Sequence, residues 1–160
     1  MSRVQLTDHF YLDEFTRSET AARFGRLIVV PLDGTVFFNL RKLCELILEP
    51  LRDNVGASIH VTSGYRPDWL NKQVRGSSKS QHTRGLAADI VVDGHNPLLT
   101  CHRIITLNLP YDQLIYEFGV WTHVSVAAEP ALPRGKVLTA QRIATNGKLR
   151  TLYKFGLPSA

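Results

Sequence analysis

The stretch that decides the fold is SQHTRGLAADIVVD, residues 80–93. Its second half, LAADIVVD, predicts a buried strand that ends in an Asp-Gly turn. Asp89 lies near the start of this strand, and His82 precedes it by seven residues on a loop that contains Gly85 and small neighbours. Such a loop can fold back tightly onto its strand. From the spacing alone, the pair is either two ligands of one metal ion or a surface histidine followed by a strand-edge carboxylate.

Outward from this stretch, the order of helical and strand patterns is typical of an α+β protein. Helical patterns cover residues 12–25, 39–56, 67–76 and 97–109. Alternating or β-branched runs predict strands over residues 58–64, 111–118 and 121–126, while residues 27–31 are either a short strand or an ordered loop. Near the C-terminus, Asn146–Gly147 separates two β-like runs and predicts a hairpin. We expect a central antiparallel sheet with helices packed on it.

The longest predicted helix, residues 39–56, has an apolar stripe that includes Cys44. Asn39 is its expected N-cap, and Pro50 should kink the helix or end its regular part. Cys44 and Cys101 form no CxxC pattern, so we expect both to be free thiols.

The composition limits the classes of function. The chain has 160 residues, of which 44% are hydrophobic and 21% charged, as in soluble globular proteins with a real core. No apolar run approaches the roughly 20 residues that span a bilayer, and no apolar signal core stands at the N-terminus, so we expect synthesis in the cytoplasm without a signal peptide. The net charge of +5 favours anionic partners, but no motif supports nucleic-acid binding. Basic residues gather just before and within the opening stretch, at Arg66, Lys72, Arg75, Lys79 and Arg84.

A second candidate histidine lies in WTHVS, residues 121–125. Alternation along this strand places His123 on the same face as Trp121 and leaves the valines for the core. A catalytic zinc usually takes three protein ligands from His and Asp or Glu and keeps a fourth position for water. His82, Asp89 and His123 would form such a set from a loop and two strands. The alternative for His123 alone is a hydrogen-bonded core histidine.

Taken together, SGYRP (63–67), SQHTRGLAAD (80–89) and WTHVS (121–125) resemble the zinc D-alanyl-D-alanine peptidase family. That family includes D-Ala-D-Ala carboxypeptidases and phage L-Ala-D-Glu endopeptidases, and it shares its fold with the Hedgehog signalling domain. Its signature S-x-H-x-x-G-x-A-x-D is met in full, as are its W-x-H and S-G-Y-R segments. The resemblance spans roughly residues 5–126, and phrases such as DHFYLDEFTRSETAARFG are similar to a phage-like subgroup. It implies a Hedgehog/DD-peptidase-like α+β fold.

By position, the resemblance implies that Zn²⁺ is bound by His82, Asp89 and His123. Arg66 would hold a substrate carboxylate or polarise the scissile carbonyl, a task that suits its fork of donors. The implied substrate-binding residues are Ser80, Gln81, Trp121 and Tyr65, for which turn formation or packing is the simpler role.

One position departs from the family pattern. Many members carry a Glu or Asp three residues before the last histidine as the general base, but Val120 stands there in this chain. The nearest acid is Glu117, six residues before His123, and we take it as the candidate base, with Asp112 as the second choice. A general base must lie within hydrogen-bond reach of the water that it activates, directly or through another water.

The implied function is a zinc metallopeptidase that cleaves peptide stems of peptidoglycan, of the D-Ala-D-Ala carboxypeptidase or L-Ala-D-Glu endopeptidase type. It would act on the cell wall in association with a phage, as a released enzyme or as part of the virion. We expect one peptidase-like domain over residues 1–160, with a core at 5–126 and a C-terminal extension at 127–160. The alternative, motivated by Val120 and the long tail, is a catalytically weak or inactive zinc-binding component of a phage particle with a structural or binding role. Its hairpin would bind a neighbouring protein, or simply complete its own sheet.

Overall fold

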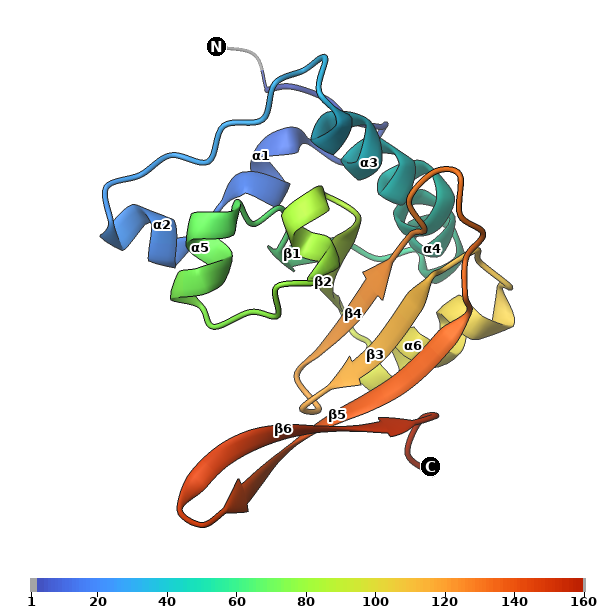
Figure 1. Cartoon of the computed structure of the whole chain (residues 1–160). Helices are drawn as coiled ribbons and strands as arrows, with labels where there is room; N and C mark the ends of the chain where they lie inside the picture. The colour runs from blue at the N-terminus through green and yellow to red at the C-terminus, as the bar shows by residue number, and fades with distance from the viewer. Residues whose placement is uncertain (1–2, 160) are drawn as a thin grey trace.

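The computed structural model describes residues 3–159, so the outermost residues of the predicted 1–160 domain lie outside it. One six-stranded sheet has the order β1-β2-β4-β3-β5-β6, and its β5–β6 end extends away from the helices (Figure 1). The strands are β1 (Ile59–Ser63), β2 (Ala87–Val92), β3 (Gln113–Glu117), β4 (Trp121–Ser125), β5 (Lys136–Thr145) and β6 (Lys148–Phe155). The helices are α1 (Leu12–Thr16), α2 (Glu19–Arg23), α3 (Thr35–Leu43), α4 (Glu49–Val55), α5 (Asp68–Gln73) and α6 (Pro97–Thr106), with a π-helical turn η1 (Cys44–Leu48) and a 3-10 turn η2 (Gln81–Arg84).

The sheet is mixed, so the expectation of a purely antiparallel sheet is wrong at one pair of strands. β3 and β5 are parallel, with Gln113 opposite Lys136, whereas the other neighbouring strands are antiparallel. The reason is the connection over residues 126–135, which carries the chain from the end of β4 past the start of β3. The backbone N–H of Lys136 donates to the carbonyl of Asp112, just before β3 begins. β5 therefore starts beside β3 and runs in the same direction.

β5 and β6 pair antiparallel along eight residues of each strand. Asn146 and Gly147 join them, and both have positive φ, as a tight hairpin turn between twisted strands requires. β6 forms the outer edge of the sheet, and all of its residues are exposed.

The two faces of the sheet have different chemistry because side chains alternate along each strand. One face carries the apolar residues of the main core, which are Ala88, Ile90, Val92, Leu114, Val124 and Val126. The opposite face carries Asp89 on β2 and His123 on β4, directly paired in register. The core thus fixes the position of the strands, and the other face is available for polar chemistry.

Helix α6 packs on the core face of β2, β3 and β4. The side chain of Asn96 caps it by accepting from the N–H of Leu99, and Pro97 occupies its first turn, where no N–H partner is needed. Cys101 and Ile104 are fully buried, and burial of a side chain such as that of Ile104 contributes about 1.5–3 kcal/mol. Both cysteines are free, as predicted. In residues 3–159, no helix has the length and apolar character to cross a bilayer.

The N-terminal segment forms two short helices, where one helix over residues 12–25 was predicted. Arg17 has an extended backbone, and the side chain of Ser18 accepts from the N–H of Ala21 to begin α2. A serine that satisfies free N–H groups favours a new helix start over continuation of the old one.

The long helix starts earlier than predicted and contains a π turn. It begins after Gly34, so the expectation that Asn39 is its N-cap is wrong; the Asn39 side-chain amide instead donates to the carbonyl of Arg84 in η2. In η1 the N–H of Glu49 donates to the carbonyl of Cys44, five residues back. This widened turn separates α3 from α4, and Pro50 lies in the first turn of α4, where its ring would clash with a normal preceding turn.

Candidate functional site

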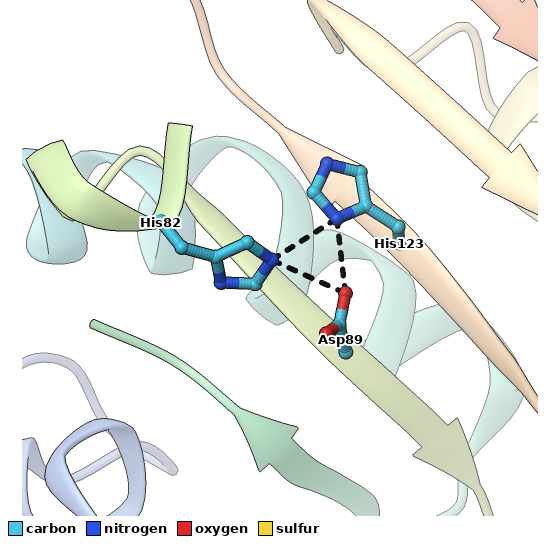
Figure 2. Close-up of side chains that lie close together, drawn as sticks. All are labelled: His82, Asp89 and His123. Atoms are coloured by element: carbon cyan, nitrogen blue, oxygen red, sulfur yellow. Dashed lines mark hydrogen bonds and ion pairs between the residues drawn. The ribbon is translucent and has the colours of Figure 1, made fainter. Parts of the chain in front are cut away.

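Three polar side chains meet on the sheet face opposite the core. Figure 2 shows His82 from η2, Asp89 from β2 and His123 from β4 pointing toward one another. The Nε2 atom of His82 lies 3.3 Å from Oδ1 of Asp89, and Nδ1 of His123 lies 2.9 Å from the same oxygen. The two nitrogens are 3.2 Å apart. His82, Asp89 and His123 are 2%, 8% and 7% exposed, so the cluster is buried.

A hydrogen bond from Nδ1, the ring nitrogen that points away from Asp89, fixes the orientation of His82. Its Nδ1 lies 2.7 Å from the carbonyl oxygen of Gly64, to which the ring donates its proton. The proton on Nδ1 leaves Nε2 as the free acceptor nitrogen, directed at Asp89. A hydrogen bond from the far ring nitrogen is what usually sets the tautomer of a metal-binding histidine.

Two glycines allow this packing. A Cβ on Gly64, the residue after β1, would lie 2.5 Å from the backbone of Phe15 in α1, so only glycine lets the chain pass close to α1 and place the Gly64 carbonyl beside His82. Gly85 has φ +68 and ends η2, and a Cβ there would lie 2.9 Å from the carbonyl oxygen of Val36. Gly64 and Gly85 are therefore explained by backbone approach and by the turn that carries His82.

The charges of the cluster are those of a metal-binding group. Burial raises the pKa of Asp89, but the adjacent His82 and His123 outweigh burial and hold that pKa below its ordinary value. Burial also lowers the pKa of His82, which the negative charge of Asp89 only partly offsets. Both shifts favour an ionised carboxylate and a neutral imidazole, the protonation states in which these side chains bind metals.

The donor set fits zinc. Two imidazole nitrogens and one carboxylate oxygen, within 4.8 Å of one another, are the ligands that a catalytic zinc site takes from a protein, with a further position left for water. The described residues contain a second group of comparable spacing, His9, Glu49 and Asp53, but it lies at the surface. There the Glu49 carboxylate accepts from the backbone N–H of His9 and contacts its ring, so it already has protein partners.

Glu117 lies at the end of β3, in the turn region beside the cluster. Trp121 donates its indole N–H to Oε2 of Glu117 over 2.9 Å, which ties the carboxylate to the strand that carries His123. Burial raises the pKa of Glu117, and the charge of Asp89 adds to this. Val120, at the position of the missing acid, is 58% exposed in the turn.

Arg66 follows β1 and lines the cleft together with Ser80. Its backbone N–H donates to the carbonyl of His82, and one terminal nitrogen lies 3.4 Å from Oγ of Ser80. Its Nε is buried without a hydrogen-bond partner in the described part of the chain. Burial lowers the pKa of Arg66, but a guanidinium remains charged. Tyr65, by contrast, packs against the core and lines a neighbouring pocket with Arg66.

The carboxylate of Asp112, which also accepts from Gln81, binds the cationic side chain of Arg134, a residue that sequence reasoning did not single out. Gln81 donates through Nε2 to Oδ2 of Asp112 over 2.9 Å, and the guanidinium of Arg134 binds both oxygens of the same carboxylate. Hydrogen bonds from Arg134 lower the pKa of Asp112. Asp112, our second choice of base, is therefore engaged as the anchor of Arg134.

The cluster opens into a cleft of about 630 Å³. Of the predicted site residues, it is lined by Arg66, Ser80, Gln81, His82, Asp89, Glu117, Trp121 and His123. Of the basic residues before the opening stretch, Arg75 and Lys79 also line it. Sequence reasoning missed a further set of lining residues, which comes from the C-terminal segment and comprises Arg134, Lys136, Leu138, Tyr153 and Phe155. Those positions carry no motif, and only strand register places them here.

A buried His–Asp–His group at the base of an open cleft, with a carboxylate and an arginine beside it, is typical of a mononuclear metallohydrolase. The family model for Peptidase M15 matches residues 8–125, well over half of the chain, and the chain belongs to this peptidase family. Membership implies a hydrolase and suggests a peptidase that acts on peptidoglycan-type substrates. Peptidases of this family usually bind zinc, and the buried group of His82, Asp89 and His123 could hold it. No curated protein matches the sequence.

Proposed function

We propose that this protein is a zinc peptidase that cleaves peptide stems of bacterial peptidoglycan, built on the Hedgehog/DD-peptidase fold. The observation that carries the proposal is the buried group of His82, Asp89 and His123, which opens into a cleft beside Glu117. In this proposal those three residues hold zinc. When bound there, zinc polarises a carbonyl and lowers the pKa of its water to about 7.

Glu117 is the proposed general base and proton carrier. Its carboxylate would accept a proton from the attacking water and later give it to the leaving amine. Trp121 keeps the carboxylate in place through its indole N–H. The raised pKa of Glu117 supports this role, since a proton carrier works best with a pKa nearer the working pH.

Arg66 is the proposed substrate-binding cation. Its buried Nε has no partner in the described part of the chain, so a carboxylate or carbonyl of the substrate would satisfy it. Arg75 and Lys79 add positive charge to the same cleft. A stem peptide, which carries several carboxylates, complements this rim, and Ser80 and Gln81 would supply further hydrogen bonds. The bond cleaved would be D-Ala–D-Ala or L-Ala–D-Glu.

The test is incubation of the zinc-loaded protein with purified peptidoglycan, with new amino termini identified by labelling and mass spectrometry. We expect one new terminal residue type, either D-Ala or D-Glu, according to the bond cleaved. Glu117→Gln should lose activity by about 10²–10⁴-fold, the usual contribution of a general base, and should retain its zinc. A zinc-loaded protein that releases no new termini from peptidoglycan or its soluble fragments refutes the proposal.

A second candidate is favoured by the position of β6. This strand is one of the two edges of the sheet, with no further strand paired to its outer side in residues 3–159, and its exposed apolar residues include Leu149 and Phe155, at 73% and 84% exposure. An exposed edge strand can add a strand from another protein. The protein would then be a zinc-stabilised component of a phage particle, with neighbouring particle proteins as partners.

The two candidates differ in their response to Glu117→Gln. Assembly through β6 should not change, whereas peptidase activity should be lost. Mass spectrometry of purified phage particles tests the location that we propose, which is delivery to the cell wall with a phage. Absence from purified particles would contradict delivery as part of the particle.

A further inference from the structure

The cleft has a second wall that lies outside the residues matched by the peptidase family. The match ends at residue 125, whereas β5 and β6 span residues 136–155. Pairing in register links these strands to the site. One cross-strand row comprises Asp89, His123, Ile115, Leu138 and Phe155, and the next comprises Trp121, Glu117, Ala140 and Tyr153.

Register puts Tyr153 in the same row as the proposed base. Neighbouring strands are about 4.8 Å apart, so the backbones of Glu117 and Tyr153 are separated by roughly two such steps. Ala140 lies between them in the row, and its side chain is small and buried, at 1% exposure. The side chains of both Glu117 and Tyr153 line the cleft. Burial raises the pKa of the Tyr153 phenol, and the negative charges of Glu117 and Asp89 add to this, consistent with their proximity.

The wall is exposed and basic. Tyr153 is 53% exposed and Phe155 is 84% exposed, although both belong to the face that continues the catalytic surface. The Nζ of Lys136 lies 5.4 Å from the centre of the Phe155 ring, so a cation stands beside the aromatic pair. Arg134 adds a second cation, partly balanced by Asp112.

We propose that Lys136, Tyr153 and Phe155 form a substrate subsite, in which Lys136 binds a carboxylate of an acidic peptide and the two aromatic rings pack against the adjoining chain. The inference rests on the proposed function for the identity of the ligand. Continuity with the metal cluster and the positive charge of the cleft lining support an acidic peptide as the occupant. Tyr153 lies in the row of Glu117, so the bound chain would extend from the reacting bond outward over the hairpin.

Alternation along β5 and β6 offers matched controls. Lys154 and Leu152 neighbour the subsite residues in sequence but face the other side of the sheet, opposite Thr139 and Gln141. Lys154→Met and Lys136→Met remove the same charge from the same hairpin, one on each face. Leu152→Ala is the matched control for Tyr153→Ala, because each removes a large side chain from β6, one on each face. All four positions are at least partly exposed, so the variants should fold, and circular dichroism verifies that they do.

The experiment measures binding without turnover. Zinc-loaded Glu117→Gln protein is titrated by calorimetry with soluble muropeptides released from purified peptidoglycan by a muramidase, and with the same muropeptides after amidation of their carboxylates. Lys136→Met should weaken binding of the acidic form about tenfold, the lower end for a hydrogen bond between charged groups, and should not affect the amidated form. Tyr153→Ala should weaken both forms at least about fivefold, as loss of an aromatic anchor does. Lys154→Met and Leu152→Ala should stay within about twofold of the parent.

The subsite would be overturned if substitutions on the two faces weakened muropeptide binding equally, or if neither face affected it. It would also be overturned if the protein bound no muropeptide at all. Failure of the subsite is distinct from failure of the peptidase proposal. If the wild-type protein releases new termini from peptidoglycan while Lys136→Met and Tyr153→Ala bind like the parent, only the subsite is wrong. If it releases none but binding still depends on Lys136 and Tyr153, the subsite stands and the peptidase proposal fails.

Discussion

Zinc binding to His82, Asp89 and His123 should raise the thermal stability of the protein by a predictable amount. The ligands come from a 3-10 turn and two strands that are brought together only in the folded chain, so zinc should bind the native state far better than the unfolded state. Without zinc, Oδ1 of Asp89 remains in contact with both histidine rings, and Gly64 still holds His82. The zinc-free protein should therefore remain folded, unlike a zinc finger.

The size of the effect follows from linkage. At a free zinc concentration of 100 times the Kd, binding to the native state adds about 2.7 kcal/mol to the free energy of unfolding. For a chain of this length, each kcal/mol raises the Tm by about 2–4 °C. The zinc-loaded protein should thus melt about 5–11 °C above the protein treated with a chelator.

Differential scanning calorimetry with and without chelator measures this difference. His82→Ala should abolish the rise in Tm, because it removes one of the three ligands. His9→Ala should leave it unchanged, although His9 belongs to the other cluster of possible ligands. An equal Tm with and without zinc in the parent, or a rise that survives in His82→Ala and disappears in His9→Ala, would refute the assignment of the metal site.

Three further perturbations test the supports of the site. Gly64→Ala would place a Cβ 2.5 Å from the backbone of α1; it should destabilise the fold by about 3 kcal/mol, the upper end of the usual cost of overpacking, and urea unfolding would contradict this by showing a loss below about 1 kcal/mol. Hydrogen bonds from Arg134 lower the pKa of Asp112. The pair therefore adds to the free energy of unfolding above the unfolded-state pKa of about 3.9, and this contribution is lost as the pH falls through the lower folded-state pKa. Asp112→Asn should therefore cost about 1–3 kcal/mol at pH 7 and less near pH 2, and urea titrations that show a constant difference across this range would exclude the pairing. Trp121→Phe frees the carboxylate of Glu117; kcat should fall roughly ten- to a hundredfold with zinc content unchanged, and an unaltered kcat in peptidoglycan hydrolysis would show that Trp121 does not position Glu117.

Local pattern left the roles of His82, Asp89 and His123 open, and the resemblance of three ordered motifs is what grouped them; the structure brings these three side chains together. The turn that carries His82 is short and marked by Gly85, and Asp89 and His123 lie on strands whose alternation separates core residues from site residues. The strands around them were predicted for the same reason. The prediction of free thiols followed from the spacing of the two cysteines, which form no CxxC pattern, and Cys44 is indeed buried.

Features set by long-range pairing could not be predicted in this way. The parallel pairing of β3 with β5 depends on the path of residues 126–135, and nothing in the periodicity of either strand indicates direction. Arg134 joins the site only because that path returns to Asp112. Tyr153 reaches the cleft through a register that spans two strand pairs. Asn39 likewise resembled a helix cap, while its actual partner, Arg84, lies 45 residues further along the chain.

The π turn η1 sets the rotational phase between the two halves of the long helix. A regular α-helix turns by about 100° per residue, so loss of one residue within Cys44–Leu48 would rotate α3 by that angle relative to α4. Asn39 would then swing away from the carbonyl of Arg84 and release the turn that presents His82. A feature that makes room for Pro50 in an N-terminal helix thus also aligns that helix with the metal cluster, and it makes the length of this helix, and not only its composition, a determinant of the site.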